Sequence, residues 1–284
     1  MEENQIANVC RNGAFGDVVY CSAITSQLKK LGYQVIFYTS CEPIAKLLDG
    51  VDLVLNISHW NNRPAGRDIS VLAYPFKDGY PAVPMMKHLI EYACIEAGLP
   101  VGESKLKSFD PITNGDYATF QPNCGWSTYK EYDYWQPILC QLSKTMPIVT
   151  IDASRSWSET CALIQHARIH LGGDSVGNHI AGAYKTPAVI LFGSTSPAGS
   201  GYKSAINLWK PHCWINGFVA PCYYEDKFSN GIKLRNCGDK CINGIEQDDI
   251  RRAIDQMLVR LKTPTIDMAA VEAELETCPY SSLC

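Results

Sequence analysis

The sequence has no long uninterrupted run of apolar residues. No stretch of the 284-residue chain approaches the roughly 18 consecutive apolar residues that a membrane-spanning helix requires. The first residues, MEENQIANVC, are polar and lack the basic region and apolar core of a secretory signal. We therefore expect a cytoplasmic protein that is not stably inserted in a membrane.

The chain also has few charged residues and little net charge. Charged side chains make up 19% of the sequence, apolar ones make up 46%, and the formal net charge is −4. This composition supports a large core and argues against disorder. It gives no global sign of a polyanionic partner such as nucleic acid, although a local basic patch is compatible with it. The length suits two domains of ordinary size.

Cysteine is plentiful, but tightly spaced cysteine pairs are absent. The 13 cysteines are scattered, many within apolar segments, which favours free thiols in a reducing compartment. One cluster has the spacing C-x8-C-x14-C-x3-C and comprises Cys213, Cys222, Cys237 and Cys241. It lacks the C-x2-C knuckles of zinc sites, so we expect packed thiols there, with structural zinc as the alternative.

Strand-like and helix-like apolar patterns alternate along both halves of the chain. In the first half, strands are predicted at 6–10, 34–38, 53–57 and 69–73, and helices at 18–30, 42–48 and 85–97. In the second half, strands are predicted at 117–120, 148–151, 168–171 and 188–191, and helices at 135–142, 158–166, directly after Ser175, and at 246–261. This alternation predicts an α/β protein with doubly wound, mostly parallel sheets.

A polar segment at residues 101–116 separates the two halves. We expect an N-terminal domain at 1–115, a C-terminal domain at 116–262, and a short helix (267–276) and tail within 263–284. Residues 59–84 are rich in Asn, Gly, Pro and Tyr, which predicts a long functional loop.

The densest group of chemically capable residues is LGGDSVGNHIAGAYKTPAVILFGST, at 171–195. The pattern places Asp174, Ser175 and His179 at the carboxyl end of a strand and in the first turn of a helix. Open parallel sheets bind ligands at this edge, and the free N–H groups of a helix N-terminus favour phosphate. Simpler interpretations are a helix cap for Asp174 and a partly buried helix histidine for His179.

A second polar turn, RNGAFGD at residues 11–17, follows the first predicted strand. Gly13 and Gly16 permit close backbone approach to a ligand, and Asp17 begins a helix whose dipole stabilises its charge. Asp17 is equally explained as a plain helix-terminal acid. The complete G-x-G-x-x-G is missing, which argues against a nicotinamide-dependent oxidoreductase. Two such turns, one per domain, predict a cleft with ligands bound from both sides.

These segments, in this order, resemble glycosyltransferase family 9, the heptosyltransferases of lipopolysaccharide core assembly. RNGAFGDVVYCSAITSQLKKLGYQVIFYT is similar to the opening of the family, and WSTYKEYDYW to its lysine-bearing segment. SWSETCALIQHARIHLGGDSVGNHIAGAYKTPAVILFGSTSP is similar to its donor-binding signature. KHLIEYACIEAGLP and CINGIEQDDIRRAIDQML resemble its domain-closing and C-terminal helices, so the resemblance covers most of residues 6–261.

The resemblance implies a GT-B fold, with two Rossmann-like domains facing across a cleft. It implies sugar transfer with inversion from a nucleotide-diphosphate sugar to a lipopolysaccharide or other surface glycan, without a metal or cofactor. Asp17 matches the general base, in a turn that also contains Arg11, Gly13 and Gly16 on the acceptor or phosphate side. The positions that match donor-binding residues are Lys130, Ser127, Asp174, Ser175, Gly177, His179, Gly193 and Thr195. Without the resemblance, the simpler interpretation of Lys130 is an ordinary exposed lysine.

The donor turn departs from the family at one position. The family has glycine two residues after the aspartate, where this chain has Val176, and glycine follows one residue later at Gly177. This departure motivates an alternative, a non-catalytic nucleotide-sugar-binding protein. The compact length and the loop residues Asn61, Asn62, Arg63, Arg67 and Lys77 motivate another, a phage-type enzyme that glycosylates a hydroxylated DNA base. The sequence leaves the sugar, nucleotide, acceptor and oligomeric state open.

Overall fold

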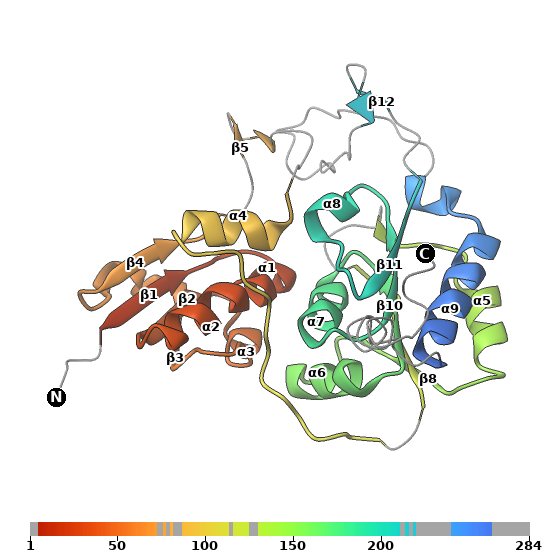
Figure 1. The fold of residues 1–284 in the computed structure, drawn as a ribbon, viewed down its shortest axis with the longest axis horizontal. Helices are drawn as coiled ribbons and strands as arrows, with labels where there is room; N and C mark the ends of the chain where they lie inside the picture. The colour runs from red at the N-terminus through yellow and green to blue at the C-terminus, as the bar shows by residue number, and fades with distance from the viewer. Residues whose placement is uncertain are drawn as a thin grey trace, which may run out of the picture.

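The chain forms two α/β units, each built on a parallel sheet (Figure 1). The structure is a computed structural model, and it describes residues 5–72, 87–113, 116–124, 130–210 and 240–262, together with the backbone of four two-residue strands. The first sheet takes its strands from residues 6–70 and the second from residues 118–209. Parallel α/β sheets are thus confirmed, while the exact domain bounds stay a prediction.

The first sheet has four strands in the order β3-β2-β1-β4. Its strands are β1 (Ile6–Cys10), β2 (Gln34–Thr39), β3 (Leu53–Asn56) and β4 (Arg67–Ser70). The helices of this unit are α1 (Phe15–Tyr20), α2 (Ser22–Lys30), α3 (Glu42–Ala45), η1 (Ile57–Asn62) and α4 (Leu89–Glu96). A small antiparallel pair, β5 (Phe76–Lys77) and β6 (Tyr80–Pro81), follows β4. Side chains alternate across β1, so Ala7 and Val9 enter the main core and Cys10 packs on the other face with Tyr38.

The helix predicted at residues 18–30 is two helices in the structure, α1 and α2. Two side chains compete for the backbone at the junction, because the Cys21 thiol donates to Asp17 O (3.3 Å) and the Ser22 hydroxyl donates to Val19 O (2.7 Å). Local side-chain bonds of this kind weaken a continuous helix. The Cys21 N–H accordingly donates to Val18 O, three residues back, and the helix restarts at Ser22.

The second sheet has five strands in the order β11-β10-β9-β7-β8. Its strands are β7 (Ala118–Gln121), β8 (Ile148–Thr150), β9 (Ile169–Gly173), β10 (Ala188–Phe192) and β11 (Ala205–Trp209). Its helices are α5 (Gln136–Leu142), α6 (Trp157–His166), α7 (Val176–Tyr184), α8 (Pro197–Ser200), η3 (Cys241–Gly244) and α9 (Gln247–Lys262). An antiparallel pair, β12 (Trp214–Ile215) and β13 (Phe218–Val219), follows β11.

Helices cover both faces of the second sheet (Figure 1). In β10, Ile190 packs with the cluster that contains α6 and α7, whereas Val189 and Leu191 pack with the cluster that contains α5 and α9. This explains the uninterrupted apolar run of β10, because both faces of a covered parallel strand are buried. Strand β11, whose residues are all half-buried, was not predicted. The predicted helix at 267–276 and most of the loop at 209–244 lie outside the described residues.

The two units meet where α1 packs against α7 (Figure 1). One cluster of buried apolar residues runs from the first sheet through both helices to one face of the second sheet. The Phe15 ring lies against Trp157 of α6, with ring centroids 4.6 Å apart. Gly16 faces the His179 ring so closely that an added Cβ would come within 2.6 Å of a ring carbon. The missing side chain of Gly16 therefore sets how closely α1 and α7 approach.

Helix α7 has a second close contact at Gly182. A Cβ at this position would lie 2.3–2.4 Å from three ring carbons of Tyr202. At Gly182, the missing side chain makes room for the Tyr202 ring.

Replacing Gly182 by alanine tests this contact. We expect Gly182→Ala to destabilise the fold by about 1–3 kcal/mol, the usual range for overpacking, measured as the urea midpoint. The matched control is Gly244→Ala, because a Cβ at Gly244 meets no atom within 4 Å. The control should be neutral or slightly stabilising. Equal midpoints for Gly182→Ala and the wild type would contradict the packing described here.

Candidate active site

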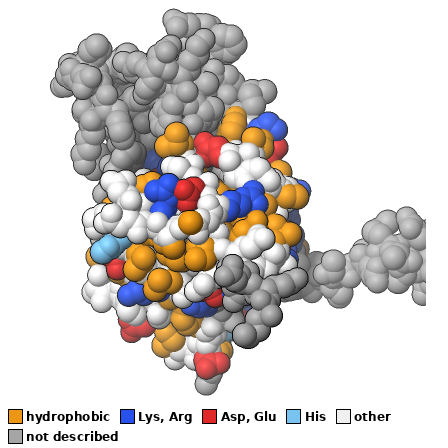
Figure 2. Space-filling model, turned by 90° about the vertical axis from the view of Figure 1, so that its left-hand side faces the viewer, with side chains coloured by type: hydrophobic (Ala, Val, Ile, Leu, Met, Phe, Trp, Pro, Cys, Tyr) orange, Lys and Arg blue, Asp and Glu red, His pale blue; other side chains and the backbone are white. Residues whose placement is uncertain are grey.

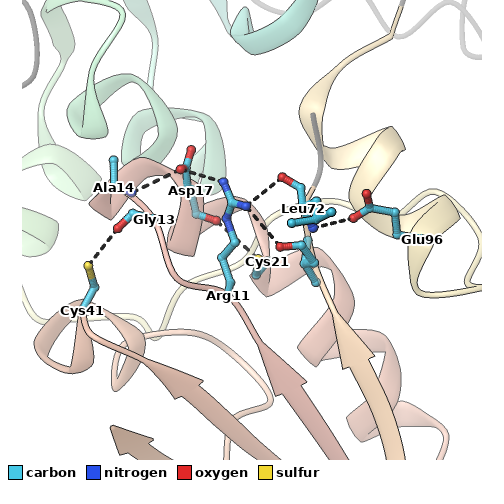
Figure 3. A network of polar contacts seen from close by, with 9 residues as sticks. Arg11, Gly13, Ala14, Asp17, Cys21, Cys41, Leu72 and Glu96 are labelled. Carbon is cyan, nitrogen blue, oxygen red and sulfur yellow. Dashed lines mark hydrogen bonds and ion pairs between the residues drawn. The ribbon is translucent and has the colours of Figure 1, made fainter. Parts of the chain in front are cut away.

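The first polar turn fixes the carboxylate of Asp17 from two directions (Figure 3). Arg11 Nη2 donates to Asp17 Oδ2 at 2.7 Å, and the Ala14 N–H donates to the same oxygen at 3.2 Å. The second bond is one half of a capping box at the start of α1, because the Ala14 side chain has no atom that could accept the reciprocal bond. Asp17 thus does act as a helix-terminal acid, and its side chain also stays 15% exposed. The two interpretations of Asp17 are compatible.

Arg11 also contacts the backbone that follows β4, the edge strand next to β1. Its Nη1 donates to Val71 O (3.1 Å) and Leu72 O (2.7 Å), just beyond the end of β4. The Leu72 N–H in turn donates to Glu96 of α4 at 2.8 Å (Figure 3). Arg11 is only 6% exposed, so its guanidinium is a fixed structural link between β1, α1 and β4.

The two glycines of this turn have protein neighbours where a ligand was expected. A Cβ at Gly13 would lie 2.5 Å from Asp17 Oδ2, and a Cβ at Gly16 would meet the His179 ring. The Gly13 carbonyl also accepts the thiol of Cys41 at 3.2 Å. Glycine is therefore needed at position 13 to make room for the Asp17 carboxylate, and at position 16 to make room for the His179 ring of the second unit.

The second turn contains a buried ion pair. Lys130 Nζ lies 3.1 Å from Asp174 Oδ2 and 3.2 Å from Asp174 O. Burial by itself would raise the pKa of Asp174, but the Lys130 ammonium and hydrogen bonds from Thr195 and Lys130 outweigh it and lower the pKa to about 2. Lys130 is accordingly neither distant from the turn nor a fully exposed lysine. Asn178 Nδ2 holds the other carboxylate oxygen of Asp174 at 3.3 Å.

Gln121 completes this turn, although the sequence did not point to it. Its Oε1 accepts the Gly177 N–H at 3.0 Å, and its Nε2 donates to Ser175 Oγ at 3.1 Å. A Cβ at residue 177 would lie 2.3 Å from Gln121 Oε1 and 2.7 Å from His170 Nε2. The glycine of the turn therefore stands at 177 because Gln121 and His170 occupy the space beside it. Ser175 occupies the N-cap position without a side-chain cap bond.

His179 lies at the contact between the two units. Its Nδ1 is 2.9 Å from the Tyr202 hydroxyl, and the His88 ring packs edge-on against Tyr202 with centroids 4.9 Å apart. Burial lowers the pKa of His179 although the carboxylates of Asp174 and Asp17 raise it. Gly16, the residue before Asp17, faces the His179 ring, so the two polar turns meet at this histidine. His179 was predicted to belong to the donor-binding turn. In the structure it lies between that turn and helix α1 of the first unit.

The remaining candidates lie at the end of β10 or outside the described residues. Gly193 is buried, and its carbonyl accepts Trp209 Nε1–H at 3.3 Å. Thr195 is 7% exposed, and its hydroxyl helps to lower the pKa of Asp174. Ser127 lies outside the described residues, and its role stays a prediction.

No arrangement of three or more His, Cys, Asp or Glu side chains that could hold a metal ion occurs within the described part of the chain. Three residues of the candidate zinc cluster, Cys213, Cys222 and Cys237, lie outside that part. Cys241 is a half-buried thiol. Among the described helices, each is too short or too polar to cross a membrane.

The basic residues of the acceptor-side loop are engaged within the protein. Arg63 pairs with Asp68 and stacks 4.2 Å above the Trp60 ring. Arg67 Nη2 donates to Ala97 O at 2.6 Å. Figure 2 views this side of the molecule, and the basic side chains drawn in colour there are scattered among acidic and apolar ones. The described part of this face therefore offers no continuous basic patch, and the side chain of Lys77 lies outside it.

Known proteins are similar in sequence to part of the second unit. Residues 126–223 match the family described as glycosyltransferase family 9 (heptosyltransferase). The chain is 27% identical over 127 residues to lipopolysaccharide heptosyltransferase 3 of Escherichia coli, which covers 45% of this chain and 34% of that protein. The match thus spans about a third of the length of that relative.

Two solved structures show the fold. The iron-containing dodecameric glycosyltransferase TibC of enterotoxigenic E. coli superposes with a TM-score of 0.71 at 15% identity, covering 93% of this chain and 78% of TibC. The ADP-heptose lipopolysaccharide heptosyltransferase II of E. coli superposes with a TM-score of 0.63 at 11% identity, covering 91% of this chain and 100% of that protein. The expected GT-B architecture is confirmed, and residues 126–223 within it match the glycosyltransferase family 9 model.

Proposed function

We propose that the protein is an inverting, metal-independent glycosyltransferase. It moves a sugar from a nucleotide-diphosphate sugar to a hydroxyl of an acceptor, by resemblance a lipopolysaccharide or other surface glycan. One observation carries the proposal: the carboxylate turn of Asp17 and the ion-paired turn of Asp174 lie on opposite sides of the α1–α7 contact, with His179 between them. A TibC structure is described as a complex with ADP-D-beta-D-heptose, so an ADP-sugar is the first donor to test.

The reaction separates charge at two places. A new bond forms between the acceptor oxygen and the anomeric carbon while the bond from that carbon to the diphosphate oxygen breaks. The acceptor proton passes to Asp17, whose carboxylate is held in place by Arg11 and the Ala14 N–H. Negative charge grows on the departing diphosphate, and Lys130 and His179 are positioned to stabilise it. Attack opposite the leaving group inverts the anomeric centre.

Asp17→Asn tests the general base. The amide cannot take the acceptor proton, so we expect turnover to fall by about 10²–10⁴-fold while the Kd of the nucleoside diphosphate changes little. The matched control is Asp52→Asn, which removes a carboxylate paired with Lys29 in the same unit. The control should retain wild-type turnover. Near-wild-type turnover by Asp17→Asn would contradict the assignment.

Lys130 variants test the donor side. Lys130→Ala removes the cation of the second turn, so we expect at least tenfold weaker binding of the nucleoside diphosphate by calorimetry, an effect of at least about 1.4 kcal/mol. Lys130→Arg keeps the charge and should bind more tightly than Lys130→Ala. Lys29→Ala removes an equivalent pair on the surface and should leave binding unchanged. An unchanged Kd in correctly folded Lys130→Ala would rule out the proposed role.

A thermal-shift screen of nucleoside diphosphates and their sugars tests the function as a whole. A ligand present at 100 times its Kd stabilises the folded state by about 2.7 kcal/mol. We expect one nucleotide series, with ADP and ADP-heptose tested first, to raise the melting temperature. Transfer with the stabilising donor should then persist in EDTA. Failure of every nucleotide to stabilise the protein would refute donor binding, and transfer that requires added metal would refute metal independence.

A further inference from the structure

Tyr202 is held rigidly against His179. Its hydroxyl lies 2.9 Å from His179 Nδ1, and the two rings are nearly perpendicular, at 86°. Gly182, one turn further along α7, leaves room for the Tyr202 ring, and His88 packs edge-on against the same ring. Residues three apart share a face of a helix, so His179 and Gly182 together form the seat of this tyrosine.

The acidity of the two groups favours one direction for their hydrogen bond, although the Tyr202 hydroxyl also has the Ser104 side chain as a partner. Burial raises the pKa of Tyr202, so its phenol keeps its proton at neutral pH. Burial also lowers the pKa of His179, so its ring is neutral and has one N–H and one unprotonated nitrogen. A phenol is a much stronger acid than a neutral imidazole N–H, and the unprotonated ring nitrogen is the more basic acceptor. The favoured bond is therefore O–H of Tyr202 to Nδ1 of His179.

The proton of His179 then lies on Nε2, at the other edge of the ring. This edge faces α1, because a Cβ on Gly16 would lie 2.6 Å from His179 Cδ2 and 3.1 Å from Nε2. Gly16 directly precedes Asp17. The N–H thus points to the contact between the two units, close to the turn that holds the carboxylate.

We infer that Tyr202 is a positioning residue that holds His179 as the Nε2–H tautomer, with this N–H directed at the α1–α7 junction. Provided that the proposed function holds, this N–H donates to an oxygen of the departing diphosphate. A preorganised donor aimed at developing negative charge stabilises a transition state without reorganisation. A second group that fixes the tautomer of a functional histidine is a general device.

The tautomer is measured directly by NMR of protein labelled with ¹⁵N-histidine, with His179→Gln used for assignment. We expect Nε2 of His179 to be protonated in the wild type, and Tyr202→Phe to give a mixture of the two tautomers. Tyr117→Phe is the matched control, since it removes a tyrosine hydroxyl bonded to Leu163 O (2.8 Å) within the second unit. The control should leave the His179 signals unchanged. A proton on Nδ1 in the wild type, or a tautomer unaltered by Tyr202→Phe, would overturn the inference.

Kinetics test what the tautomer does. Tyr202→Phe keeps the ring in the seat formed by Gly182, so the fold should be retained. We expect kcat/KM for the donor to fall about three- to tenfold, as for the loss of one hydrogen bond, with the acceptor KM unchanged. The same substitution in a His179→Gln background should cause no further loss. Losses that multiply in the double variant would show that Tyr202 acts independently of His179.

The transfer assay and the NMR measurement distinguish a failure of the proposed function from a failure of this inference. A wild-type protein that shows no transfer with any donor removes the proposed function, yet the NMR measurement still decides the tautomer. A wild-type protein that transfers sugar but has the proton on Nδ1 removes this inference and leaves the proposed function intact.

Discussion

The packing of α1 against α7 is the constraint on which the rest of the site depends. Both helices begin at the carboxyl end of a strand near the middle of their sheet, so each contributes the polar turn that precedes it. Gly16 allows the two helices to meet with the His179 ring between them. A side chain at residue 16 would move the Asp17 turn away from the second unit. The two turns, which are far apart in the sequence, can lie close together because residue 16 has no Cβ.

The charges at this junction are held in pairs, which is costly for stability and useful for chemistry. Arg11 with Asp17 and Lys130 with Asp174 are largely removed from solvent, with side-chain exposures from 5% to 18%. Burying such pairs costs desolvation energy that their attraction often does no more than offset. A pair such as Lys29 with Asp52, at 50% and 30% exposure, avoids that cost and contributes little. The buried pairs are therefore better explained by the need to fix a carboxylate and an ammonium in place than by stability.

Much of the architecture could be predicted from the sequence because it follows local patterns. The strand at residues 6–10 matches β1 because alternating side chains and the following glycine turn define it. The single helix at 18–30 was wrong because Cys21 and Ser22 compete for backbone carbonyls, which an apolar pattern does not reveal. Strand β11 was missed because its residues are uniformly half-buried and show no alternation.

The site residues that were missed share one physical cause. Gln121 and Tyr202 each occupy space left by a glycine in α7, at positions 177 and 182. A glycine inside a helix signals that something approaches closely, but the sequence does not say which side chain does so. Gln121 lies at the end of β7 and Tyr202 in the loop after α8, so only tertiary packing brings these two side chains to α7.

The departure at Val176 has a structural reason in this packing. The Gly177 N–H already donates to Gln121, so a donor phosphate that used this N–H would have to displace a neutral side chain. The neighbouring contacts, Lys130 to Asp174 and His179 to Tyr202, are made by side chains that do not depend on which residue stands at 176. Gln121 thus shapes this turn through the Gly177 N–H and Ser175, while Lys130 and Asp174 pair beside it.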